Sequence, residues 1–84
     1  MRVRPLAVNM PVKLFALTDE NESKQAMSLL EQEKIDYELI EPDTTLMGYQ
    51  VMFAVTGTHR TPVLCVDGRA YRRLEGVQSF FATR

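Results

Sequence analysis

Two short apolar runs flank an Asp-Gly pair in Thr61-Pro62-Val63-Leu64-Cys65-Val66-Asp67-Gly68-Arg69-Ala70-Tyr71. An Asp-Gly pair in this setting predicts a β-hairpin, because both central residues of a tight type I′ turn need positive φ. Pro62 has no N–H to donate to a strand ladder, so it fits only the first residue or the edge of the strand that it opens. We therefore expect a hairpin near the C-terminus, with the rest of the chain packed against it.

Size and charge limit the class of protein. The chain has 84 residues, enough for one small domain with a single core. Ten Lys and Arg against eleven Asp and Glu give a net charge of −1, whereas nucleic-acid-binding domains usually carry a basic surface. No apolar run in the sequence reaches the ~20 residues that span a bilayer. We expect neither nucleic acid nor a membrane among the partners of this chain.

The first residues and the single cysteine set expectations about boundaries and compartment. Residues 1–10 include two arginines but no long apolar run, so we interpret them as a tail ahead of a domain at 11–84. Cys65 is the only cysteine, which rules out an internal disulfide and any Cys-x-x-Cys motif within this chain. A cytoplasmic address is the simplest expectation.

The N-terminal half predicts a strand, a helix and a second strand. Residues 12–17 form a short apolar run with β-type residues, typical of a buried strand. A helix should follow, with Asp19 as N-cap and Glu22 completing a capping box, because apolar residues recur at helical spacing over 26–30. Apolar and polar residues alternate over 35–40, which predicts a half-buried strand.

A second helix is expected over 45–56, after a break at Glu41-Pro42-Asp43-Thr44. Asp43 or Thr44 is the expected N-cap, and Gly57 is the expected C-terminal stop. Apolar residues lie on more than one face of this helix, and its β-branched content leaves a strand open as an alternative. We expect the sheet to cover most of it; the alternative is that part of this surface meets a partner chain.

A closing helix is predicted by Leu74, Val77, Phe80 and Phe81, which recur at i, i+3, i+6 and i+7. The element order is then β-α-β-α-β-β-α, that of an α/β domain. A right-handed βαβ unit makes its two strands parallel, and the hairpin adds two antiparallel strands to the same sheet. We expect a four-stranded mixed sheet with helices on both faces.

This element order, with a proline opening the third strand, resembles the thioredoxin fold and, more narrowly, the glutaredoxin family. The resemblance covers residues 12–81. The stretch 26–31 followed by 35–38 is similar to the family's first helix and second strand, and Thr61-Pro62-Val63 is similar to its cis-proline segment. The resemblance implies a glutaredoxin-like domain at 11–84 with a cis Thr61–Pro62 bond.

The family's Cys-x-x-Cys or Cys-x-x-Ser motif falls on Glu20-Asn21-Glu22-Ser23 in this chain. By the resemblance, Glu20 stands at the position of the nucleophilic cysteine and Ser23 at that of the resolving cysteine. Thiol–disulfide exchange needs a thiolate, which neither a carboxylate nor a hydroxyl supplies. We therefore expect no catalytic residue and no dithiol oxidoreductase activity.

The family's glutathione groove is changed as well. Its usual Gly-Gly pair after the fourth strand corresponds to Arg72-Arg73, which would crowd the groove. Carboxylates at the start of the first helix would repel anionic glutathione, the only cofactor that the resemblance suggests. We hypothesise a closed groove in which the arginines form ion pairs with Glu20 or Glu22.

Two other functions stay open. A redox role would need glutathione binding to persist or Cys65 to react, although its apolar neighbours favour core packing. Ser23 also resembles the serine of some glutathione transferases, whose N-terminal domain shares this fold, but Arg73-Leu74 replaces the Glu-Ser pair that holds their ligand. A metal site lacks ligands, because His59 is the only histidine and is expected in a surface loop.

The expectation that follows is a redox-inactive protein-binding module. Thioredoxin folds bind extended peptides beside the cis-proline, through backbone groups that do not need the catalytic cysteine. The partner would be another protein, and the chain itself a monomer or a weak homodimer. The expected groove residues are Glu20, Ser23, Arg60, Thr61, Pro62, Arg72 and Arg73.

Overall fold

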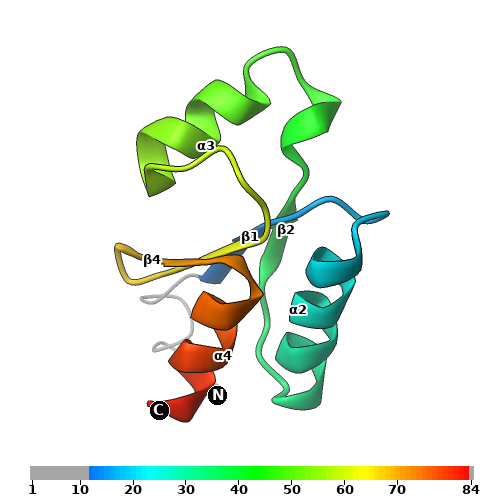
Figure 1. Ribbon diagram of the computed structural model, residues 1–84, viewed down its shortest axis with the longest axis vertical. Coiled ribbons are helices and arrows are strands. Elements are labelled where there is room, and N and C mark those ends of the chain that lie inside the picture. Colours follow the sequence, from blue (N-terminus) through cyan, green and yellow to red (C-terminus); the bar gives the residue numbers. More distant parts are fainter. Residues whose placement is uncertain (1–11, 84) are drawn as a thin grey trace, which may run out of the picture.

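The computed structural model describes residues 12–83 (Figure 1). Their elements in order are β1 (Val12–Phe15), α2 (Asn21–Gln32), β2 (Glu38–Ile40), the 3₁₀-helix η1 (Pro42–Thr44), α3 (Gly48–Thr56), β3 (Val63–Val66), β4 (Arg69–Arg72) and α4 (Arg73–Ala82). The predicted order is confirmed, with η1 as an additional turn. The tail predicted at 1–10 and the two ends of the predicted domain, residues 11 and 84, lie outside the described residues.

The four strands form one mixed sheet in the order β2-β1-β3-β4. Strands β1 and β2 are parallel, with Leu14 opposite Leu39. Strands β1 and β3 are antiparallel, with Leu14 opposite Leu64, and β3 and β4 form the antiparallel hairpin. The sheet predicted from the sequence is therefore confirmed.

Helices cover both faces of this sheet: α2 and α4 pack on one face and α3 on the other (Figure 1). Because successive side chains of a strand point to opposite faces, Leu14 of β1 belongs to the core cluster under α2 and α4, whereas Phe15 belongs to the cluster under α3. The first cluster consists of Leu14, Ala16, Ala26, Leu30, Leu64, Val66 and Val77. The second is smaller and has Phe15, Met52 and Val63 at its centre.

The hairpin has the predicted turn. Asp67 has φ 52° and Gly68 has φ 80°, so both central residues lie in the left-handed region that a type I′ turn requires. Pro62 immediately precedes β3, and the Thr61–Pro62 peptide bond is cis, as the resemblance implies. The hairpin and the loop before it are therefore as predicted.

The start of α2 differs from the prediction. The N-cap is Glu20 rather than Asp19, and no side chain caps the helix, so the predicted capping box is wrong. The Glu20 N–H donates to the carbonyl of Leu17, and the Glu20 carbonyl accepts the first helical bond from Lys24. This turn fixes the helix start one residue later than the sequence pattern predicts, and it directs the Glu20 side chain to other partners.

Strand β2 is also shorter than predicted. Only Glu38–Ile40 pairs with β1, and the predicted strand residues 35–37 do not. The Ile35 N–H donates to the carbonyl of Leu30 at 3.0 Å, which ties this residue to the end of α2. Ile35 and Tyr37 nevertheless pack against the core under α2.

The helix predicted over 45–56 begins only at Gly48, and neither Asp43 nor Thr44 caps it; its N-cap is Met47. Residues Pro42–Thr44 instead form η1. At Gly48 the backbone passes so close to Pro42 that a β-carbon would overlap the Pro42 carbonyl oxygen and lie 2.7 Å from the carbonyl carbon. Gly57 ends α3 with φ 76°, as predicted.

The expectation that the sheet covers most of α3 is wrong. Within the helix only Met52 and Thr56 are buried. Large apolar side chains stay exposed along it and just before it: Leu46, Met47, Val51, Phe53 and Val55. The apolar surface predicted from the sequence therefore faces outward, as in the alternative of a partner-facing helix.

None of the helices in residues 12–83 has the length and apolar character needed to cross a lipid bilayer.

Candidate functional site

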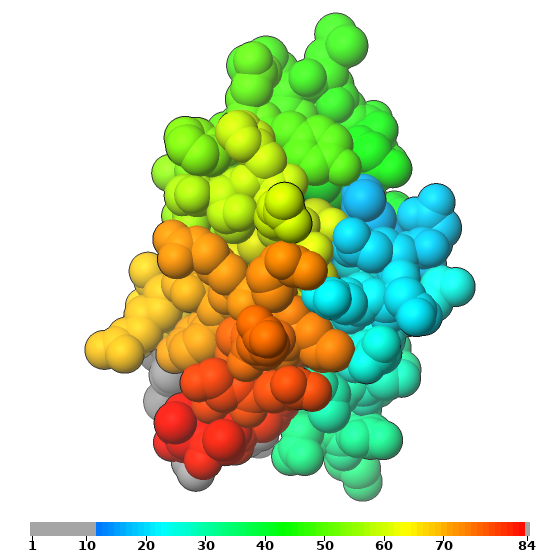
Figure 2. All heavy atoms as spheres, in the orientation of Figure 1, coloured from blue at the N-terminus to red at the C-terminus, as the bar shows by residue number. Residues whose placement is uncertain are grey.

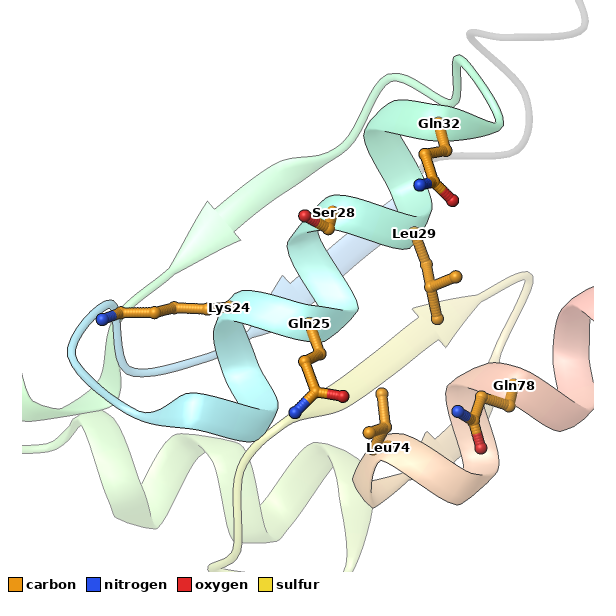
Figure 3. Close-up of a pocket in the computed structure, with 7 residues that line it drawn as sticks. All are labelled: Lys24, Gln25, Ser28, Leu29, Gln32, Leu74 and Gln78. Carbon is orange, nitrogen blue, oxygen red and sulfur yellow. The ribbon is translucent and has the colours of Figure 1, made fainter.

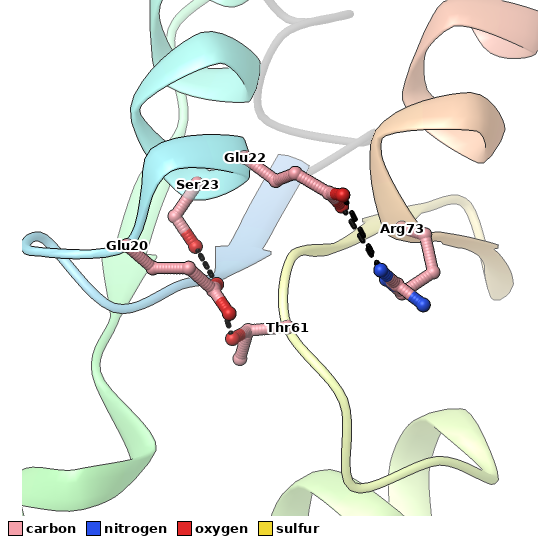
Figure 4. Close-up of polar contacts among 5 residues, drawn as sticks. All are labelled: Glu20, Glu22, Ser23, Thr61 and Arg73. Atoms are coloured by element: carbon pink, nitrogen blue, oxygen red, sulfur yellow. Dashed lines mark hydrogen bonds and ion pairs between the residues drawn. The ribbon is translucent and has the colours of Figure 1, made fainter.

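Three segments that are distant in the sequence meet at one end of the sheet. They are the start of α2, the loop that contains Thr61 and Pro62, and the start of α4 (Figure 4). On the face shown in Figure 2, the first turn of α2 (cyan) borders the beginning of α4 (orange). These segments bring together Glu20, Glu22, Ser23, Thr61 and Arg73.

Glu20 is the centre of a hydrogen-bonded cluster. The Ser23 hydroxyl donates to Glu20 Oε1 at 2.5 Å, and the Thr61 hydroxyl donates to the same oxygen at 2.6 Å. Ser23 Oγ in turn accepts the N–H of Leu17 at 3.1 Å. Ser23 is fully buried and Thr61 is 6% exposed, whereas Glu20 is half-buried. The cluster thus joins the end of β1, the start of α2 and the cis-proline loop around one oriented carboxylate.

Arg73 forms the ion pair that the sequence hypothesis predicts. Its Nη2 lies 3.3 Å from both carboxylate oxygens of Glu22, with about two fifths of each side chain exposed. The Arg73 backbone has φ 64°, and its N–H donates to the carbonyl of Pro62 at 2.7 Å. Its Nε is buried and has no hydrogen-bond partner within residues 12–83. Arg73 therefore fastens the start of α4 to both other segments of the site.

Arg72 does not take part in this pairing, contrary to the hypothesis. Its guanidinium donates to the carbonyl of Thr56 from Nε at 3.2 Å and from Nη2 at 3.0 Å. Arg72 ends β4, on the sheet face of Ala70 and α3, and Arg73 already begins α4. The side chains of the two neighbouring arginines consequently lie on opposite sides of the sheet, and that of Arg72 binds the C-terminal end of α3.

The expected groove is not fully closed. A cavity of about 220 Å³ remains, lined by Leu17, Glu20, Tyr49, His59, Arg60, Thr61 and Arg73. Of the predicted groove residues, four line it and three do not: Ser23 and Pro62 are buried, and Arg72 points elsewhere. Leu17, Tyr49 and His59 were not expected to line it. In the sequence, Gly57 could have indicated the position of His59, because a left-handed residue at the end of a helix reverses the chain direction. Here the reversed chain places residues 59–61 at the cavity.

His59 is exposed, as predicted, and its ring stacks on Phe53 of α3, with centroids 4.4 Å apart and planes 13° apart. This stacking connects the loop before Pro62 to the exposed face of α3. No group of three or more His, Cys, Asp or Glu side chains within the described chain is arranged to hold a metal ion.

Cys65 lies apart from this cluster. It is half-buried in β3, packs against the core cluster under α3, and stands opposite Lys13 in the sheet. Burial raises the pKa of the Cys65 thiol, and the nearby Lys13 ammonium only partly opposes this. A raised pKa leaves little thiolate near neutrality, so the packing role predicted for Cys65 fits its surroundings.

A second cavity, of about 320 Å³, lies between α2 and α4 (Figure 3). Leu29 and Leu74 point toward one another across it. The remaining lining residues are Lys24, Gln25, Ser28, Gln32 and Gln78. It contains none of the predicted groove residues and a single charged side chain, so the polar cluster around Glu20 is the better candidate site.

Neither a protein-family model nor a curated protein matches the sequence. Solved structures of glutaredoxins do match. The buckwheat glutaredoxin–glutathione complex has 20% identity and a TM-score of 0.75, covering 94% of this chain and 74% of that one. The holo form of glutaredoxin C1 from Populus tremula x tremuloides has 23% identity and a TM-score of 0.74, covering 94% and 81%. Glutaredoxin (grx-1) from Archaeoglobus fulgidus has 15% identity and a TM-score of 0.73, covering 96% of each chain.

These similarities identify the fold: the chain adopts a glutaredoxin-like, thioredoxin-type α/β fold, as its sequence predicts. With Cys65 as its only cysteine, it has no Cys-x-x-Cys motif.

Proposed function

We propose that this chain is a glutaredoxin-like protein-binding module without dithiol chemistry, and that it binds its partner in the groove beside Pro62. One observation carries the proposal. The resemblance assigns the position of the nucleophilic cysteine to Glu20, and this carboxylate is held in place by the hydroxyls of Ser23 and Thr61. The place of a reactive thiol is therefore taken by an oriented carboxylate, which cannot perform thiol–disulfide exchange.

No other residue of the site supplies the missing sulfur. Disulfide exchange requires a thiolate that can reach its substrate. Cys65 packs against the core cluster under α3, and burial raises the pKa of its thiol. Ser23 is fully buried and its hydroxyl donates a hydrogen bond to Glu20, so the serine is not accessible to a substrate, which argues against the transferase-like alternative.

The groove keeps the backbone groups that an extended peptide needs. Within residues 12–83, neither the backbone N–H nor the carbonyl of Thr61 forms a hydrogen bond. Free N–H and C=O groups on one residue can pair with an added strand, the mode in which main-chain bonds supply affinity and side-chain pockets supply specificity. The cavity beside Thr61 offers such a pocket.

The exposed apolar face of α3 extends the proposed contact surface. Tyr49 of α3 lines the cavity, and Phe53, four residues later on the same side of the helix, is 49% exposed. Apolar side chains at this level of exposure commonly mark contact surfaces when they are contiguous. A partner that occupies the groove would thus have apolar surface available next to it.

A cytoplasmic address and a monomeric or weakly dimeric state belong to the same proposal.

The test is an assay of glutathione-dependent reduction of a small mixed disulfide. The wild-type chain should give only the background rate at any concentration. A glutaredoxin that contains the Cys-x-x-Cys motif, assayed under the same conditions, is the positive control, because its thiol at the helix start has a lowered pKa. Turnover by the wild-type chain above background would overturn the redox-inactive part of the proposal.

Glutathione binding without turnover is the second candidate. It is favoured by the residual cavity with Arg60 and Arg73 in its lining, and by the buckwheat relative, which was solved with glutathione. Glu20 and Glu22 oppose it, because they place negative charge where an anionic tripeptide would sit. A titration with reduced glutathione followed by amide chemical shifts decides: shifts confined to Glu20, Thr61 and Arg73 support binding, and unchanged spectra at millimolar ligand exclude it.

A further inference from the structure

We infer that the groove selects an extended peptide with a basic side chain, which pairs with Oε2 of Glu20, the carboxylate oxygen that accepts neither the Ser23 nor the Thr61 hydroxyl. The inference rests on the proposed function, since it names the chemistry of the partner segment that the groove would bind. It assigns to Glu20 the role of a specificity-determining residue.

Hydrogen bonds to one of its two oxygens orient the carboxylate of Glu20, and within the described part of the chain the other oxygen is left without a donor. Both hydroxyl donors, from Ser23 and Thr61, bind the same oxygen, Oε1. Among residues 12–83, Oε2 accepts no hydrogen bond, and Glu20 forms no ion pair. A carboxylate has about four acceptor positions, so two donors leave it unsaturated. Because two bonds fix the group in advance, little side-chain entropy remains to be lost when a cation binds.

The position of Glu20 fits a side chain carried by an added strand. Its carboxylate is 2.6 Å from the Thr61 hydroxyl, and the unpaired backbone groups belong to the same Thr61. A peptide that pairs with this backbone therefore passes next to Glu20. Half of its side chains point toward the domain, since neighbouring residues of a strand alternate between faces. One of these can reach the carboxylate across the cavity.

Among the described residues, Glu20 is the one carboxylate that lines the cavity, whose lining also contains the cations Arg60 and Arg73. Glu22 is already paired with Arg73, so Glu20 is the carboxylate of the site that lacks a cationic partner. A half-buried charge gains more from a partner than an exposed one, because the solvent screens it less. Arg60 lines the same cavity and is exposed, which disfavours uniformly basic peptides. The expected ligand consequently has a single basic residue at the position facing Glu20.

The experiment selects peptides from a random library displayed on phage, using the full chain as bait. Three baits are compared: wild type, Glu20→Gln, and Asp19→Asn. Glutamine keeps an oxygen that can accept both hydroxyls, so the fold should be preserved, and thermal unfolding checks this. Asp19→Asn removes the same charge one residue away, at an exposed residue outside the cavity. It therefore controls for long-range electrostatics.

Wild type and Asp19→Asn should both select peptides with Lys or Arg at one fixed position, and Glu20→Gln should lose that preference. A synthetic copy of the selected peptide should bind Glu20→Gln roughly tenfold more weakly than wild type. A peptide with its basic residue replaced by alanine should bind both proteins equally, because the two changes then remove the same contact.

The failures are distinguishable. Peptides that are selected without a basic position, or with one that persists in Glu20→Gln, overturn this inference and leave the protein-binding function standing. If no peptide is enriched on the wild-type chain, the peptide-binding groove itself is wrong, and the inference falls with it.

Discussion

Replacing Ser23 with alanine should lower the free energy of unfolding by about 2 kcal/mol. Ser23 is fully buried and makes two hydrogen bonds, donating to Glu20 at 2.5 Å and accepting from the Leu17 N–H at 3.1 Å. The substitution leaves this N–H without its partner in a partly buried place, which costs about 1–3 kcal/mol. Alanine is the better helix former by about 0.5 kcal/mol, so it returns part of that loss.

Thr61→Val is the matched comparison for the second hydroxyl. Thr61 only donates to Glu20, and its removal leaves no N–H unpaired, so this variant should lose about 1 kcal/mol. Because both hydroxyls share one acceptor oxygen, the double variant should lose less than the sum of the two single losses.

Urea unfolding followed by circular dichroism measures these differences. With an m-value of about 1 kcal/mol/M for a small domain, the midpoint of Ser23→Ala should fall by about 2 M. Ser28→Ala is the control, because Ser28 is exposed in the same helix and gains only the helix propensity of alanine. If Ser23→Ala unfolds at the same urea concentration as Ser28→Ala, the cluster does not stabilise the fold and the reasoning is wrong.

Three further predictions follow from particular backbone and side-chain environments. Gly48→Ala should lower the free energy of unfolding by about 2 kcal/mol or more, because its β-carbon would overlap Pro42, whereas the exposed Gln50→Ala in the same helix should be neutral in thermal unfolding. Arg73→Gly should be more stable than Arg73→Ala by about 1 kcal/mol, the reverse of the usual order within helices, since φ is 64° there; equal stability in urea would contradict this. Burial raises the pKa of the Cys65 thiol in the folded chain above its pKa in the unfolded chain. The thiol therefore stabilises the fold fully at a pH below its unfolded-state pKa, and this stabilisation is lost as the pH rises through the folded-state pKa. The stability difference between wild type and Cys65→Ala should therefore shrink as the pH rises above about 8.5, the ordinary pKa of a cysteine thiol, and a constant difference would refute it.

The fold was predictable where local chemistry and tertiary structure agree. Asp67-Gly68 determines its turn through the φ values that the two residues tolerate, and the hairpin register follows from that turn. The apolar stripe of α2 and the closing helix each match a buried face. The start of α2 was missed by one residue because a backbone turn from Leu17 makes Glu20 the N-cap, and the Glu20 side chain then makes a long-range contact with Thr61, 41 positions away. Helix-capping rules consider only residues that are close in sequence, so they cannot anticipate a contact between residues this far apart.

The exposure of α3 was not predictable from its composition. Its apolar residues look like a core helix, but the sheet offers α3 only a small cluster around Phe15 and Val63, and Met52 fills it. The approach of Gly48 to Pro42 then fixes how the helix leaves η1. Hydrophobic pattern reports how much apolar surface a helix has, whereas the area available on the partner layer decides how much of it is buried.

The candidate site was half predictable for a related reason. The ion pair of Arg73 with Glu22 follows from charges placed on facing segments by the fold resemblance. Arg72 was assigned to the same groove because the two arginines are adjacent in sequence. The alternation of side chains along β4 would have given the right answer. Arg72 shares the face of Ala70 and therefore reaches Thr56, on the other side of the sheet.

Recognition and stability are carried by different atoms of one cluster, and this makes the proposed functions separable. Glu20→Gln removes the charge of the carboxylate but keeps an oxygen for both hydroxyls, so peptide selectivity should change while the unfolding midpoint changes little. Ser23→Ala removes a buried donor and acceptor but leaves the carboxylate of Glu20 in the lining of the cavity, so stability should fall while the preference for a basic residue persists. A site that had merely lost its thiol without gaining a binding role would show the second effect alone. Only a groove in which Glu20 contacts the ligand shows both.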